Sequence, residues 1–222
     1  MGFITNEGVK NRVYVNFNAK TGAIQVSRKE GENWVRTDVR GIENLLVTKV
    51  EMREDTYEGQ PVTKLVVHGV MDKGTEDEMG VVFTSNMGAW ATGRFLSLLC
   101  ESDLSRPITV VARTQYKGSQ YKRKDGSMSD PLERDLHSIE IVQDGRYVRT
   151  NDLPPKANLV RMGQGRYARE VVDNSARLEW AEIKLKEISA KFGRSAEAAG
   201  HDPVAQADDF SDAPIDYDDI PF

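Results

Sequence analysis

Alternating apolar and polar residues predict short strands along much of the chain. In residues 13–17 the three large apolar side chains fall on one face and the polar ones on the other, as in a half-buried strand. Residues 18–22 are turn formers that lead into a returning strand, and residues 55–61 break the pattern with a Gly and a Pro. The alternation predicts strands at residues 13–17, 23–27, 34–37, 45–53, 62–71, 80–84, 107–113 and 137–142.

The spacing of apolar residues changes to that of a helix at two places. Residues 86–100 carry large apolar side chains at close to helical spacing, with Ser85 or Asn86 as the candidate N-cap. The clearer helix covers residues 175–192, and Gly193 lies just past it, where a left-handed cap costs least. Its apolar stripe, expected to pack on the same chain, consists of Leu178, Ala181, Leu185, Ile188 and Phe192.

The order of these elements predicts a mainly β fold. From residue 45 to residue 142 the order is strand, strand, strand, helix, strand, strand. This is the order of the five-stranded OB-fold barrel, with its helix between strands 3 and 4. We expect an OB-fold domain with an N-terminal β-hairpin extension over residues 1–172, a C-terminal helix over 173–193 and an acidic tail over 194–222. Residues 143–172 give no clear pattern.

The composition is that of a soluble protein. Hydrophobic residues make up 39% and charged residues 29% of the 222 residues, which suits a globular domain with generous loops. No apolar run is long enough to span a membrane, and the N-terminus does not read as a secretion signal. Cys100 is the only cysteine, which excludes an internal disulfide or a cysteine-cluster zinc site. We expect a cytoplasmic protein in which Cys100 is a buried apolar residue.

The net charge of −5 is divided unevenly along the chain. Residues 195–222 contain eight acidic residues and no Lys or Arg, so residues 1–194 hold the other 27 acids against all 30 bases. A mildly basic body with a strongly acidic tail is typical of polyanion binding at one end and an interaction tail at the other. Because Ala, Asp, Ser and Pro dominate residues 194–222, we expect this tail to be disordered.

The most basic segment, residues 113–126, lies between the last two predicted strands. OB-folds use this loop to contact nucleic acid. Aromatic rings can stack there on unpaired bases while cations follow the phosphates, whereas a merely solvated hairpin is the alternative. The segment supplies Tyr116 and Tyr121 as rings, and Arg113, Lys117, Lys122, Arg123 and Lys124 as cations.

Three other residues are weaker candidates for the same role. Tyr14 points away from the apolar face of its predicted strand. Trp34 and Arg36 share a strand face, which pairs a stacking ring with a cation. For all three, an ordinary exposed side chain or a ring covering the edge of the core explains the pattern equally well.

The last residues of the sequence combine apolar and acidic groups. An Ile-Pro-Phe end with a terminal carboxylate and flanking acids fits a small apolar pocket ringed by Lys or Arg. Proline also stiffens the peptide and so lowers the entropy lost on docking. The residues expected to bind a partner are Asp218, Asp219, Ile220, Pro221 and Phe222.

The segment Asp218-Asp219-Ile220-Pro221-Phe222 resembles the C-terminal tip of bacterial single-stranded DNA-binding proteins. In that family the tip is carried on a disordered acidic linker and recruits replication, recombination and repair enzymes. The likeness covers the tail alone. The long hairpin, the extra helix and the tip together are more similar to a bacteriophage-encoded member with an OB-fold. The resemblance implies a role for the tip in a bacterial cell or a phage-infected host, but it identifies no DNA-contact residue.

The chain shows no sign of catalysis. It has no phosphate-binding loop, nucleophile elbow or dinucleotide fingerprint, and its three histidines are far apart in sequence. One acidic cluster lies in a predicted turn, where solvated carboxylates are a more ordinary explanation than a metal site. We therefore expect no enzyme activity, no metal and no other cofactor. The cluster consists of Asp72, Glu76, Asp77 and Glu78.

The leading hypothesis is a non-enzymatic protein that binds single-stranded DNA with little sequence preference and recruits partner proteins through its tail. The main alternative is an adaptor whose basic body binds an acidic protein. RNA remains open as a ligand because nothing identifies a contact to the 2′-hydroxyl, and duplex DNA because phosphate contacts alone would suffice. The sequence also leaves the oligomeric state open.

Overall fold

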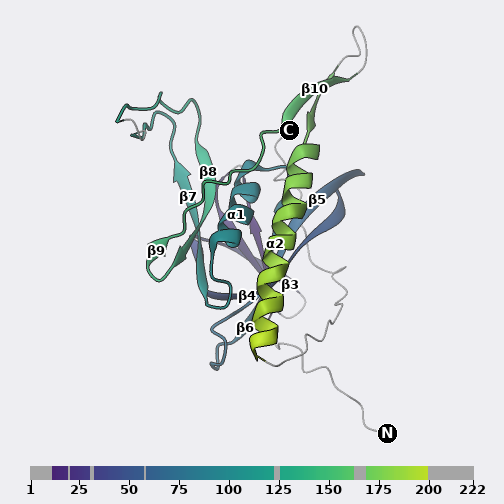
Figure 1. Ribbon diagram of the computed structural model, residues 1–222, viewed down its shortest axis with the longest axis vertical. Helices are drawn as coiled ribbons and strands as arrows, with labels where there is room; N and C mark the ends of the chain where they lie inside the picture. The colour runs from purple at the N-terminus through teal and green to yellow at the C-terminus, as the bar shows by residue number, and fades with distance from the viewer. Residues whose placement is uncertain are drawn as a thin grey trace.

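The chain is mainly β, as predicted (Figure 1). The computed structural model describes residues 12–19, 21–30, 33–57, 59–122, 126–162 and 169–199. Within these ranges the strands are β1 (Arg12–Phe17), β2 (Ile24–Glu30), β3 (Asn33–Val39), β4 (Gly41–Tyr57), β5 (Gln60–Met71), β6 (Met79–Asn86), β7 (Ile108–Gln115), β8 (Leu136–Gln143), β9 (Arg146–Tyr147), β10 (Asn158–Met162) and β11 (Arg169–Asp173), and the helices are α1 (Trp90–Glu101) and α2 (Ser175–Ala199).

Nine of these strands form one sheet, in the order β3-β2-β1-β6-β5-β4-β7-β8-β9. β1 and β2 form the predicted N-terminal hairpin, and β3 extends it antiparallel. β1 also pairs in parallel with β6, with Val15 opposite Phe83, so the hairpin is part of the main sheet. Each neighbouring pair from β6 through β5, β4 and β7 to β8 is antiparallel.

The sheet curls back on itself but does not close. Arg40 is the single residue between β3 and β4, although four strands lie between these two in the sheet. The carbonyl oxygen of Arg40 accepts a hydrogen bond from the backbone N–H of Ala112 on β7, at 3.0 Å. In the turn between β1 and β2, a Cβ on Gly22 would lie 2.3 Å from Nδ1 of His137 on β8.

The predicted five-stranded OB-fold barrel is therefore not confirmed. The order of its elements is present as β4, β5, β6, α1, β7 and β8. However, β6 pairs with β1 along one of its edges. Among the described strands, no strand pairing joins the two ends of the sheet. Local alternation predicts that a segment is a strand, but it does not specify which strands become neighbours.

Apolar side chains on the inner face of the curled sheet form the core. β4 is 17 residues long, and a bulge between Val47 and Lys49 shifts its pairing with β5. The extra residue lets Val47 and Val50 both point inward, where both are buried. The predicted break at residues 55–61 is shorter than expected, because β4 continues to Tyr57 and β5 begins at Gln60.

The helix α1 packs in this core through fully buried residues that include Phe95, Leu98 and Leu99. The predicted N-cap is wrong, because the residue before the helix is Ala89, which makes no side-chain capping bond. Asn86 instead accepts a hydrogen bond from the backbone of Gly88 at 2.7 Å, in the turn that precedes the helix. An Asn side chain readily forms such local turns.

The helix α2 packs on the same chain, as predicted. Ala181 and Ile188 are fully buried, and the other three residues of the predicted stripe pack against the core. The predicted end at Gly193 is wrong, because α2 continues to Ala199. The residues after Gly193 include three Ala and one Glu, which are strong helix formers, so they offset the roughly 1 kcal/mol that a glycine costs inside a helix.

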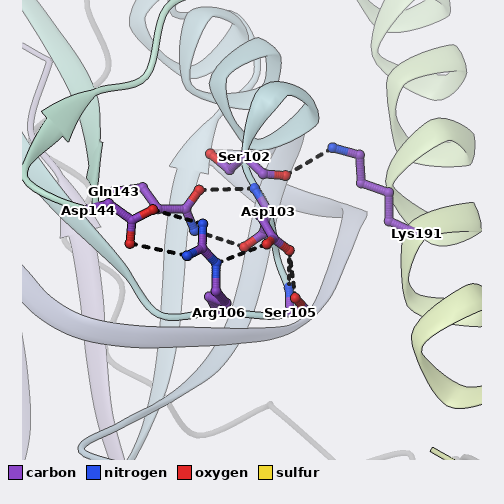
Figure 2. Close-up of polar contacts among 7 residues, drawn as sticks. All are labelled: Ser102, Asp103, Ser105, Arg106, Gln143, Asp144 and Lys191. Atoms are coloured by element: carbon purple, nitrogen blue, oxygen red, sulfur yellow. Dashed lines mark hydrogen bonds and ion pairs between the residues drawn. The ribbon is translucent and has the colours of Figure 1, made fainter. Parts of the chain in front are cut away.

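Polar contacts connect the loop after α1 to the turn between β8 and β9, and also to α2 (Figure 2). Arg106 forms ion pairs with Asp103 at 2.9 Å and with Asp144 at 2.8 Å. Lys191 of α2 donates to the carbonyl oxygen of Ser102 at 3.0 Å and also contacts that of Cys100. A lysine at these carbonyl groups complements the negative end of the α1 dipole.

Cys100 is half-buried rather than fully buried as expected. Burial raises the pKa of its thiol to about 11. A thiol with a raised pKa is a weak nucleophile at neutral pH.

Candidate nucleic-acid interface

Residues 116–135 connect β7 to β8 and are called the β7–β8 excursion; backbone hydrogen bonds fix the arrangement of its described parts, residues 116–122 and 126–135. Ser119 N donates to Tyr116 O at 3.0 Å across a turn in which Gly118 has a φ of 83°, which glycine adopts without strain. Gly118 N donates to Leu132 O at 2.8 Å, and Leu132 N donates to Ser119 O at 3.0 Å. The two halves of the β7–β8 excursion are therefore held side by side.

A buried serine supports the outer part of the excursion. Ser129 Oγ accepts a hydrogen bond from Tyr121 N at 3.0 Å, and Ser129 N donates to Tyr121 O at 2.8 Å. Just beyond this pair, Lys122 and Met128 form an isolated β-bridge. Tyr121 and Lys122 are thus presented on an ordered backbone.

The rings of the excursion are open to solvent. Tyr116 is 68% exposed and Tyr121 is 55% exposed. Lys117 and Lys122 beside them are exposed, and so is Arg113 near the end of β7. A ring this exposed adds little to the core, so its faces are accessible to a planar ligand.

Seven residues of this segment were predicted to contact nucleic acid. The structure places five of them on β7 and the β7–β8 excursion: Arg113, Tyr116, Lys117, Tyr121 and Lys122. Arg123 and Lys124 lie outside the described residues, and so do the five residues of the predicted partner-binding tip, Asp218 to Phe222.

The weaker candidates Tyr14, Trp34 and Arg36 also lie together, on the outer face of the sheet. We use "outer face" for the side opposite the core over strands β3, β2, β1, β6, β5 and β4. The rings of Tyr14 and Trp34 meet edge to face with their centroids 5.5 Å apart. Ser27 on β2 is the cross-strand neighbour of both Tyr14 and Arg36, and Lys29 is the neighbour of Trp34. Sequence alternation placed Tyr14 on the polar side of its strand and Trp34 on the same side as Arg36, and the fold brings the two rings together.

A charged cluster that sequence reasoning missed continues the outer face across β4 and β5. His68 is the cross-strand neighbour of Lys49 and of Val82, and Val82 is the neighbour of Tyr14. His68 Nε2 lies 3.1 Å from Oε1 of Glu51, and Lys49 Nζ lies 2.6 Å from Oε2 of the same carboxylate. The signal in the sequence was the alternation of charged residues at 49, 51 and 53, which marks the outer side of a strand.

Burial and charge shift the pKa values of this cluster. Burial lowers the pKa of His68, and the hydrogen bond and charge of Glu51 oppose that shift without cancelling it. For Glu51, burial raises the pKa, but the contacts with Lys49 and His68 outweigh it, so the pKa is lowered overall. At neutral pH a neutral imidazole and one carboxylate therefore lie close to two cations, Lys49 and Arg53.

The β1–β2 turn connects the outer-face group to the base of the excursion. A Cβ on Gly22 in this turn would lie 2.9 Å from Oγ1 of Thr114 on β7. Thr114 in turn is hydrogen-bonded to His137 of β8 at 2.9 Å. Both groups of candidate residues therefore belong to one packed unit.

The acidic residues at the β5–β6 turn hydrogen-bond within the turn and to β4. Glu78 accepts a hydrogen bond from the backbone of Gly74 at 2.8 Å, and Asp72 accepts one from the side chain of Asn44 at 3.1 Å. Among the residues that the structure describes, no group of three or more His, Cys, Asp or Glu is placed to hold a metal ion.

Neither helix in the described ranges is sufficiently long and apolar to cross a membrane. No family model matches the chain, and no curated protein or solved structure matches it either.

Proposed function

We propose that this protein binds single-stranded DNA without strong sequence preference and does no chemistry on it. The observation that carries the proposal is the β7–β8 excursion, in which two exposed tyrosines and exposed lysines stand on a backbone fixed by hydrogen bonds. A single strand presents flat base faces and a chain of phosphates. Tyr116 and Tyr121 would stack on bases, and Lys117 and Lys122 would lie near phosphates.

The outer face supports the same function with a second set of rings and cations. Tyr14 and Trp34 pair there, with Lys29 and Arg36 as cross-strand or same-strand neighbours. Bases stack on aromatic rings in a sequence-tolerant way, because every base has a π face. The outer face would therefore extend the path of the strand beyond the excursion.

We further propose that β4–β8 with α1 is an OB-fold opened at one edge. OB-folds bind oligonucleotides on the face of their second and third strands and through the loops after the first and fourth strands. In this chain the corresponding parts are β5 and β6, the β4–β5 turn and the β7–β8 excursion. Pairing of β1 with β6 replaces the closure of the barrel and adds β1, β2 and β3 to the outer face.

The tail would provide the second part of the function. Its resemblance to the tip of bacterial single-stranded DNA-binding proteins supports recruitment of replication, recombination or repair proteins. Ile220 and Phe222 would fill an apolar pocket on the partner, and the neighbouring acids would meet basic residues around it.

Replacing both tyrosines of the excursion tests the proposal. The Tyr116→Ala/Tyr121→Ala variant should bind fluorescent oligo(dT) more weakly, by about 1–3 kcal/mol for each base that loses its stack. Binding is measured by anisotropy at several salt concentrations, with a duplex of equal length in parallel. Tyr147→Ala is the matched control, because this tyrosine is 54% exposed on β9, outside the excursion.

Two outcomes of these binding measurements would contradict part or all of the proposal. Unchanged affinity in the double variant would remove both tyrosines from the site. If the unaltered protein binds neither the oligonucleotide nor the duplex at low salt, the proposed function is wrong.

A further inference from the structure

The strand β3 lies at one end of the nine-stranded sheet. Among the described strands it pairs with β2 alone, in an unbroken register from Asn33 opposite Glu30 to Val39 opposite Ile24. The edge of β3 that faces away from β2 has no strand partner in the described part of the chain. The backbone N–H and C=O groups along such an edge can pair with a further strand.

The sequence of β3 lacks most of the features that keep an edge strand from pairing. It contains no Pro, Gly or Lys, and its register with β2 has no bulge, although proteins commonly protect an edge with these devices. The middle of the strand, Arg36, Thr37 and Asp38, is exposed. The two charges in this stretch have opposite signs, so they do not simply repel every incoming strand.

The charges of β3 complement each other when the strand pairs antiparallel with a copy of itself. In a symmetric pairing centred on Thr37, Arg36 of each copy lies opposite Asp38 of the other. Val35 then lies opposite Val39. Opposite charges and Thr pairs at directly facing positions stabilise an antiparallel ladder, whereas like charges there destabilise it. Of the symmetric self-pairings of β3, this is the one that places Arg36 and Asp38 face to face.

This pairing also keeps the two faces of the sheet in register. Side chains alternate along a strand, so Arg36 and Asp38 lie on the same outer face as Trp34. Val39 lies on the opposite side, where it packs against the core as the neighbour of Ile24. The sheets of two copies would therefore continue into each other with their outer faces on one side.

We propose that β3 pairs antiparallel with β3 of a second copy of this chain, around a two-fold axis at Thr37. Such a contact uses the same surface on both copies and so closes as a dimer. One short strand from each copy buries less area than a typical stable dimer does, so the association is weak and depends on protein concentration. The inference goes beyond the proposed function and does not rest on it, because the contact involves no DNA.

Reversing one charge tests the pairing without changing the core. The full-length chain and its variants are compared by sedimentation equilibrium over a range of concentrations, at low ionic strength and without DNA. The unaltered chain should form dimers reversibly. Asp38→Arg places like charges at both facing positions, so we expect association about tenfold weaker. Glu182→Arg, the same change in charge at an exposed position on α2, is the matched control and should associate like the unaltered chain.

Two complementary variants test the register. Arg36→Asp should weaken self-association as Asp38→Arg does, because it places acids opposite acids. In an equimolar mixture of these two variants, each mixed dimer regains both opposite-charge pairs, so mixed dimers should form about as tightly as the unaltered dimer. The double variant Arg36→Asp/Asp38→Arg should also self-associate like the unaltered chain. Such recovery would not occur if either single variant had simply misfolded.

Three results would overturn the inference. The first is an unaltered chain that stays monomeric at every concentration. The second is association that Asp38→Arg does not weaken, which would place the interface elsewhere on the molecule. The third is loss of association in both single variants without recovery in their mixture. Because none of these measurements includes DNA, the proposed function is decided separately by the oligo(dT) titrations.

Discussion

His68 and Glu51 show how single residues on the outer face depend on each other. The carboxylate favours the protonated imidazole, but burial outweighs it and the pKa of His68 is lowered. Glu51→Gln keeps the shape and removes the charge. We therefore expect the pKa of His68 to fall further, as measured by NMR titration of its ring protons. Glu54→Gln, an exposed carboxylate on the same strand that bonds Thr63, should leave His68 unchanged.

The lowered pKa also fixes the sign of the effect of His68 on stability. The unfolded chain, with an ordinary histidine pKa of 6.5, binds the proton more readily than the folded chain. The contribution of His68 is therefore full above pH 6.5 and is lost as the pH falls toward its folded pKa. In Glu51→Gln this loss of stability should extend to lower pH. A rise in the pKa of His68 would contradict the account.

The two rings of the outer face show that the sequence predicts the strand face of a residue but not its neighbours on other strands. Alternation placed Tyr14 on the polar side of its strand, and Trp34 and Arg36 on a common side. The contact between the two rings required β2 to lie between β1 and β3, which alternation does not specify. The cluster at His68 was missed for the same reason, because its members belong to two strands and are 17 positions apart.

At the scale of elements, α1 packs closely against the segment that precedes β10, and a substitution in α1 can test this contact. A Cβ on Gly93 would lie 2.6 Å from Cβ of Pro154. Gly93→Ala gains up to about 1 kcal/mol in helix propensity. The clash with a rigid ring should cost more, so we expect a net loss of about 1–3 kcal/mol in the free energy of unfolding. Urea denaturation measures it.

A double-mutant cycle provides the control for this prediction. Pro154→Gly removes the ring that Gly93→Ala meets, so the two substitutions together should cost less than the sum of each alone. Additive effects would show that the two residues do not press on each other.

Elements were predicted well where the local pattern and the final packing agree. β1 and α2 are examples, because one buried stripe produces the periodicity of each. β10 and β11 were missed because Leu159, Val160 and Val172 are exposed and lie on both faces of the two strands, so no alternation marks an inner side. The end of α2 was misplaced because a run of good helix formers outweighs one glycine.

At the scale of the whole molecule, the separation of charge links the body to the tail. The basic body and the acidic segment after residue 194 belong to one chain. We propose that the tail occupies the DNA-binding surface when DNA is absent and is released when DNA binds. In this way DNA binding would free the tip for partner proteins.

Deleting residues 207–222 tests this competition directly. The deletion removes six acidic residues and no base, so the formal net charge changes from −5 to +1. The truncated protein should bind oligo(dT) more tightly, by about fivefold at low salt, and the difference should shrink as added salt screens the charges. Ile220→Ser/Phe222→Ser keeps every acid and should bind DNA like the unaltered protein while losing partner capture. Equal affinities with and without the tail at low ionic strength would mean that the tail does not compete, and partner recruitment would then be independent of DNA binding.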